Sequence, residues 1–142
     1  MCLILMKIVI VMAYHIPKHL ADLPIYHKAE EIFVLSRSIA SYLHQDLCGL
    51  KPDGSEDNNI YFSGDIIQQS ESLVPEILKA EQERHTDNKH KHIHALNRLT
   101  QTLYRNCRRL ERSHSDGKDF IPILRRELKN FKRLQRSWML SL

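Results

Sequence analysis

The sequence predicts an all-α fold, an antiparallel up-and-down four-helix bundle, on three observations. Four segments of about 20 residues repeat apolar side chains at a spacing of three and four, which is typical of amphipathic helices. Glycine occurs 4 times and proline 5 times in 142 residues, too rarely for a fold built from many turns. The segments are joined by polar breaks, and four helices with one apolar stripe each bury those stripes most simply against one another.

The first helix is expected at 24–47, where Pro24 suits a first turn and Asp22 is a candidate cap. Its predicted buried stripe consists of Ile25, Ala29, Ile32, Ser36, Ile39, Leu43 and Leu47. The second helix is expected at 59–84, after the break CGLKPDGSEDNN, with a stripe of Phe62, Ile66, Ser70, Leu73, Ile77 and Ala80. Pro75 should bend this helix because proline removes one backbone hydrogen bond.

The third helix is expected at 91–113, with a stripe of Ile93, Leu96, Leu99, Leu103, Cys107 and Leu110. The fourth is expected from residue 120 to residue 138, with Asp119 as a candidate cap and Pro122 in its first turn. Its stripe consists of Phe120, Leu124, Leu128, Phe131, Leu134 and Trp138. Because these two helices are consecutive, we expect them to pack side by side.

Charge is divided unevenly along the chain. Residues 1–88 carry 7 Lys/Arg against 13 Asp/Glu, a net charge of −6, whereas residues 89–142 carry 14 against 4, a net charge of +10. This asymmetry suggests either a polyanionic partner or docking between acidic and basic faces of separate copies in a homo-oligomer.

The basic residues of the last two segments lie opposite their apolar stripes at about 100° per residue. Three interpretations remain: a solvated face, a nucleic-acid-binding surface, and docking on an acidic protein face. The candidate nucleic-acid-binding residues, for RNA or DNA, are Lys91, Arg98, Arg105, Arg108, Arg109, Arg112, Arg125, Arg126, Lys129, Lys132, Arg133 and Arg136. Tyr104 is the only aromatic side chain near them, so contacts to the phosphate backbone fit better than base stacking.

Metal and catalytic signals are weak, and we expect neither an enzyme nor a cofactor. Four histidines cluster near the start of the third helix, namely His85, His90, His92 and His94. Two imidazoles four residues apart bind metal weakly, so a solvated, pH-sensitive turn is the simpler interpretation. Glu111 and His114 form one Glu-x-x-His spacing without the second copy that a di-iron bundle uses. Glu127 and Gln135 fall inside the fourth apolar arc, where we expect Glu127 to pair with an arginine of a neighbouring helix.

Residues 1–19 are predicted to be an apolar extension, and residues 20–142 the bundle domain. The stretch from Cys2 to Ala13 is apolar except for Lys7 and is too short to span a bilayer. Three explanations remain: a start assigned upstream of a true start at Met12, a weakly membrane-inserting tail, or an added strand or helix. The three scattered cysteines lack paired spacing, so we expect a cytoplasmic protein without a membrane partner.

Short motifs within 20–142 resemble a family of small bacterial four-helix-bundle proteins. The stretch DLPIYHKAEEIFVLSRSIASYL (22–43) is similar to that family's first helix, YFSGDIIQQSESL (61–73) to its second-helix entry, and ALNRLTQTLYRNCRRLE to its leucine-rich third helix. The family is related to proteins encoded in intervening sequences of ribosomal RNA genes and to the accessory variability protein of diversity-generating retroelements. The resemblance implies a basic homopentamer that binds a reverse transcriptase and nucleic acid.

Overall fold

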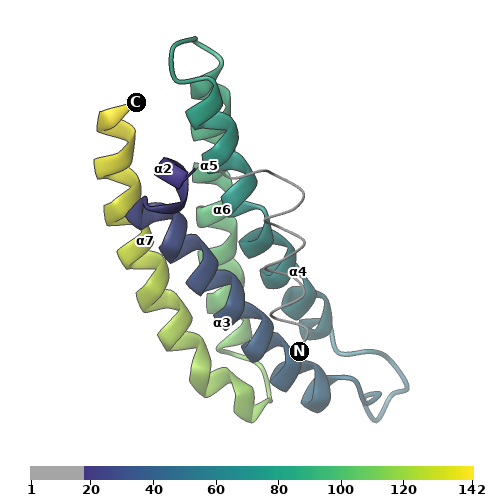
Figure 1. Ribbon diagram of the computed structural model, residues 1–142. Coiled ribbons are helices and arrows are strands. Elements are labelled where there is room, and N and C mark those ends of the chain that lie inside the picture. The colour runs from purple at the N-terminus through teal and green to yellow at the C-terminus, as the bar shows by residue number, and fades with distance from the viewer. Residues whose placement is uncertain (1–17) are drawn as a thin grey trace.

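A computed structural model describes residues 18–142, and the secondary-structure elements of these residues are all helices (Figure 1). The predicted all-α fold class is confirmed, because long helices pack antiparallel to one another in a bundle. In chain order the elements are α2 (Lys18–Ala21), α3 (Pro24–Leu47), α4 (Asn59–Glu71), α5 (Leu73–Gln82), α6 (Lys89–Leu110), the 3-10 helix η1 (Asp116–Phe120) and α7 (Ile121–Ser141). The predicted apolar extension lies outside the described residues, apart from residues 18 and 19.

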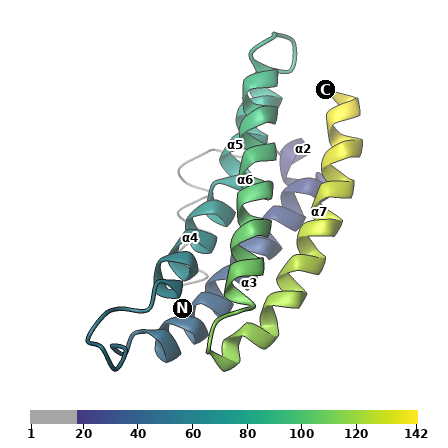
Figure 2. The same cartoon turned by 180° about the vertical axis from the view of Figure 1, so that it is seen from behind.

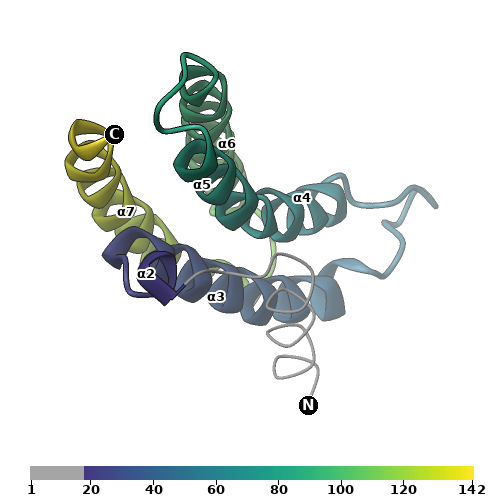
Figure 3. The same cartoon turned by 45° about the horizontal axis from the view of Figure 1, so that its top comes forward.

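The long helices form a ring of neighbours. Helix α3 packs against α4 and α7, and α6 packs against α4, α5 and α7. From behind, α6 runs between α4 and α5 on one side and α7 on the other (Figure 2). Seen from nearer the top, α5 continues the course of α4 beside α6, while α7 lies along α3 (Figure 3). The expected side-by-side packing of the last two helices is therefore confirmed.

The second predicted helix is broken rather than continuous. Helix α4 ends at Glu71 and α5 begins at Leu73, with Ser72 between them. Pro75 has no N–H to bond the carbonyl one turn earlier, so the helix is interrupted in the turn before it. The predicted bend at Pro75 is confirmed, and its consequence is that α4 packs along α3 whereas α5 packs mainly along α6.

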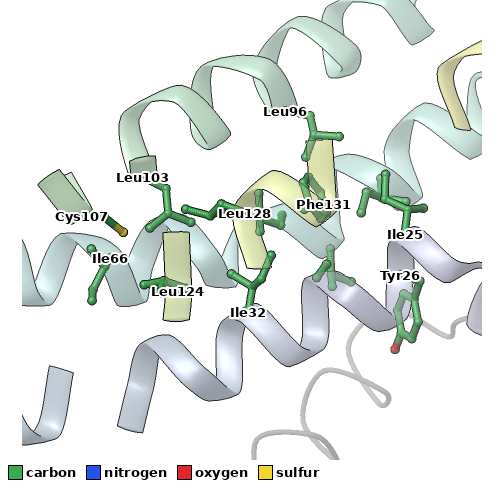
Figure 4. Packing of buried hydrophobic residues seen from close by; sticks show 14 of the residues in the cluster. Ile25, Tyr26, Ile32, Ile66, Leu96, Leu103, Cys107, Leu124, Leu128 and Phe131 are labelled. Carbon is green, nitrogen blue, oxygen red and sulfur yellow. The ribbon is translucent and has the colours of Figure 1, made fainter. Parts of the chain in front are cut away.

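The core consists of the predicted apolar stripes turned inward. Leu103 of α6, Leu124 and Leu128 of α7, and Ile32 of α3 are all fully buried and converge on one another (Figure 4). Cys107 is also fully buried, as predicted, and burial raises the pKa of its thiol to about 12. Burying one such aliphatic side chain contributes about 1.5–3 kcal/mol, so these seams account for much of the driving force for folding.

Trp138 closes the core at the end of α7. Its indole is 5% exposed, and its Nε1–H donates to Glu81 Oε1 of α5 at 2.7 Å. At the same end, Lys89 Nζ donates to the Leu142 carbonyl at 2.7 Å, and an Arg84 guanidinium N–H donates to the Ser141 carbonyl at 3.1 Å. The last turn of α7 is therefore tied to α5 and to the start of α6.

Two predicted caps and one core position are wrong. Helix α3 is preceded by Leu23, without a side-chain cap, so Asp22 does not cap it. Asp119 lies inside η1, and α7 begins after Phe120 instead. Because η1 delays the start of α7, Ile121 takes the buried position, and Phe120 is 43% exposed with its ring 5.5 Å from that of Tyr42.

Candidate nucleic-acid interface

The basic residues of α6 all lie at the surface, but they point in two directions. Five of the predicted cations lie on this helix, Arg112 lies in the turn after it, and all six are exposed, namely Lys91, Arg98, Arg105, Arg108, Arg109 and Arg112. Arg109 turns toward α4, where its guanidinium carbon lies 4.9 Å from the centroid of the Phe62 ring. Arg98 lines a hollow together with Gln69 of α4 and Glu76 of α5, and Lys91 lies on the same flank of the helix. At about 100° per residue, Arg105 lies only about 20° from Arg98 on the outer side of α6, and Arg108 is turned about 60° further toward α7.

The basic residues of α7 lie on its outer surface and on the side that meets α6. Arg126, Lys129, Arg133 and Arg136 are exposed, and Lys132 is half-buried. Lys132 lies over Tyr104 of α6, with its Nζ 5.1 Å from the ring centroid. Arg136 and Lys132 also line a hollow of about 250 Å³ between the two helices, whose other walls are mostly polar. Its floor includes Gln135, which is 3% exposed and donates to Asn97 Oδ1 of α6.

Arg125 differs from the other predicted cations because a carboxylate lies against it. Its Nε lies 2.6 Å from Glu111 Oε1, and the two side chains are 31% and 26% exposed. The carboxylate at the end of α6 therefore neutralises Arg125 and joins the two helices. Sequence periodicity could not find this pair, because its members belong to different helices. Glu111, which precedes His114 by three residues, is engaged in this ion pair.

Eight of the predicted cations remain, all on α6, on the turn after it and on α7, the two helices that lie side by side in Figure 2. We call them the basic face: Arg105, Arg108, Arg112, Arg126, Lys129, Lys132, Arg133 and Arg136. Across residues 18–142, no carboxylate lies within ion-pair distance of any of the eight. Arg125 contacts Glu111, and Lys132 contacts Tyr104. These two contacts hold residues 104–111 of the chain beside residues 125–132 of α7, next to the basic face. The twelve predicted cations thus comprise these eight, the three nearer α4 and α5 (Lys91, Arg98 and Arg109), and Arg125, which is paired with Glu111.

Glu127 serves to join α7 to α3. Lys28 Nζ of α3 donates to Glu127 Oε2 at 2.7 Å and to Glu31 Oε2 at 2.7 Å. The hydrogen bond to Glu127, followed by that to Glu31, raises the pKa of the Lys28 ammonium. The expected partner of Glu127 was an arginine, and the structure has Lys28 instead. This pair occupies the α3 side of α7, away from the basic face.

The histidine cluster does not converge on a common centre. His90 and His94 are exposed on α6, and His92 Nδ1 lies 3.0 Å from Glu76 Oε2 of α5. Within the part of the chain that the structure describes, no three His, Cys, Asp or Glu side chains come together as metal ligands. The same residues contain no helix that is long and apolar enough to cross a membrane.

Comparison of the chain with models of protein families, with curated proteins and with solved structures found no match.

Proposed function

We propose that this protein is a non-enzymatic nucleic-acid-binding accessory protein, and that the basic face is its binding surface. One observation carries the proposal: eight solvent-accessible cations lie on, or directly after, two helices that pack side by side, and no described carboxylate neutralises them. An ordinary solvated helix surface mixes charges of both signs, because opposite charges three and four residues apart stabilise the helix. The basic face forgoes that stabilisation, which a polyanionic ligand would restore.

The contacts would be made to phosphates and would not depend on base sequence. Phosphate contacts from lysine and arginine release condensed counterions, so the logarithm of the binding constant falls with the logarithm of salt by about 0.9 per contact for duplex DNA. If five or six of the eight cations contact phosphate together, the slope would be about −5. A slope of this size would distinguish a phosphate-binding surface from an incidental attraction.

The test compares two double variants of equal charge. Lys129→Glu/Arg136→Glu reverses two cations of the basic face, while Lys51→Glu/Lys79→Glu reverses two exposed cations on the α3–α4 loop and on α5. Binding of a labelled nucleic acid across a salt series should weaken sharply in the first variant and little in the second. Equal weakening in both would mean that net charge alone governs binding and that the basic face is not the binding surface.

A second candidate, a homo-oligomeric interaction scaffold, is favoured by an exposed apolar cluster. Tyr42 is 58% exposed, Phe120 43% and Ile123 44%, and the first two rings lie 5.5 Å apart. Clustered exposed apolar side chains often mark interaction surfaces. Sedimentation should show an oligomer that Tyr42→Glu/Ile123→Glu disrupts, whereas a monomer at micromolar concentration would exclude this function. The reverse transcriptase partner implied by the family resemblance would be tested separately by co-purification.

A further inference from the structure

We infer that the basic face binds the two backbones of a nucleic-acid double helix in preference to a single strand. This inference rests on the proposed function and names its ligand. It is carried by two features. The aromatic rings beside the basic face are already covered by cations, and the remaining cations form two rows that lie side by side.

The first feature removes base stacking from the basic face itself, since the exposed rings of Tyr42 and Phe120 lie against each other where η1 meets α3. Proteins that bind single strands without sequence preference stack bases on exposed aromatic rings. Beside the basic residues, Tyr104 is covered by the Lys132 ammonium at 5.1 Å and Phe62 by the Arg109 guanidinium at 4.9 Å. Trp138, the one tryptophan of the chain, is buried and bonded to Glu81. A base could reach the ring of Tyr104 or Phe62 only after displacing its cation.

The second feature matches two strands rather than one. The α6 row runs from Arg105 to Arg112 and the α7 row from Arg126 to Arg133. The α7 row covers seven helical steps, or about 10 Å at 1.5 Å per residue, whereas the α6 row covers three helical steps, about 4.5 Å, from Arg105 to Arg108 before it reaches Arg112 in the turn after α6. The contacts of Glu111 with Arg125 and of Tyr104 with Lys132 place the two rows beside each other.

The spacing of the rows suits a duplex groove. Packed helix axes lie about 8–10 Å apart, which falls between the widths of the minor and major grooves of B-form DNA, about 6 and 12 Å. Each row could then contact the phosphates of one strand. The hollow between the rows is small, at about 250 Å³, and is lined by amides and cations such as Gln101, Gln135 and Arg136. It offers no aromatic slot for an extruded base, so recognition would depend on backbone shape.

The experiment measures binding of the full chain to matched ligands of one mixed sequence of about 20 nucleotides, as single-stranded DNA and RNA and as DNA, RNA and hybrid duplexes, at salt of about 50–200 mM. Because each stacked base is worth roughly 5- to 150-fold in affinity, a surface without free rings should bind a duplex at least about tenfold more tightly than its single strands. Single strands binding as tightly as any duplex would overturn the inference while leaving the proposed function intact. No binding to any ligand would refute the proposed function itself.

Two single variants test the reason for the preference. Lys132→Ala removes one positive charge and uncovers the Tyr104 ring, whereas Arg136→Ala removes one charge from the same helix without uncovering a ring. The ratio of duplex to single-strand affinity should fall several-fold in Lys132→Ala relative to Arg136→Ala. If both variants keep the same ratio, the covered ring does not govern selectivity and the inference fails. Circular dichroism of both variants confirms that the helices are retained.

Discussion

Replacing Arg125 should lower the stability of the fold and leave nucleic-acid binding unchanged. A residue that contacts nucleic acid, as the sequence predicts for Arg125, would show the reverse. The Arg125→Met variant keeps the length of the side chain but removes the charge that faces Glu111 at 2.6 Å. The Glu111 carboxylate, 26% exposed, would then be partly withdrawn from water without its counter-charge. The expected effect follows from this intermediate exposure.

The magnitude lies between two limits. Fully exposed ion pairs contribute about 0.2–1 kcal/mol, and removing one partner of a buried pair costs about 3–5 kcal/mol. With roughly three-tenths of each side chain exposed, we expect Arg125→Met to lower the free energy of unfolding by about 1 kcal/mol. In urea, with a slope of about 2 kcal/mol per molar, the unfolding midpoint should fall by about 0.5 M.

Urea unfolding followed by circular dichroism measures this loss, and Glu111→Gln completes a double-mutant cycle. The double variant should be less destabilised than the sum of the single variants by about 0.5–1 kcal/mol, since both remove the same pair. The control is the neighbouring Arg126→Met, an exposed residue of the basic face that should change stability by less than about 0.5 kcal/mol. If the Arg125 and Glu111 effects are strictly additive, or if Arg125→Met weakens nucleic-acid binding as Lys129→Glu does, Arg125 is not a structural residue.

The remaining predictions concern the core, the glycines and the thiols. Leu103→Ala, at a fully buried position, should lower the free energy of unfolding by about 2–5 kcal/mol, and a loss below about 1 kcal/mol would contradict the packing described for α6. Gly117→Ala should lower the free energy of unfolding by about 1 kcal/mol or more, because the new Cβ would lie 3.3 Å from Leu43 Cδ2 and Tyr42 Cβ. At Gly64 a new Cβ would meet nothing within 4 Å, so Gly64→Ala should stabilise α4 by about 0.5–1 kcal/mol. A change of the same sign in both variants would contradict this contrast. At pH 8 the Cys107 thiol, whose pKa is raised to about 12 by burial, should resist alkylation that modifies the exposed Cys48, and peptide mass spectrometry should find Cys107 labelled only in denaturant.

What the sequence predicts well is whatever lies within one helix. The stripe that begins at Ile25 and ends at Leu47 could be read from its spacing alone, and α3 has the predicted limits. Pro75 likewise indicated where the second helix is interrupted, because the missing N–H is a property of that residue and its own turn. Burial of Cys107 follows from the same periodicity.

What could not be predicted depends on which helices lie beside each other and how they are turned. A helical wheel places Arg125 among the outward cations, but only the packing of α7 on α6 brings Glu111 to it. The same wheel sets Arg108 and Arg109 about 100° apart, but it does not tell that the Arg109 side meets Phe62 of α4 and the Arg108 side faces α7. The periodicity predicts that Phe120 is buried, but it is exposed, because the 3-10 turn that shifts the start of α7 has no periodic signature.

The chain's single tryptophan supplies an intrinsic spectroscopic reporter at an informative place. Trp138 is 5% exposed and its N–H is bonded to Glu81, so its emission depends on whether the last turn of α7 stays docked on α5. Fraying of that turn would expose the indole to water and shift its fluorescence to longer wavelength. Titrations and melts of unlabelled protein can therefore follow one defined junction between helices, and a Glu81→Gln exchange would calibrate the signal.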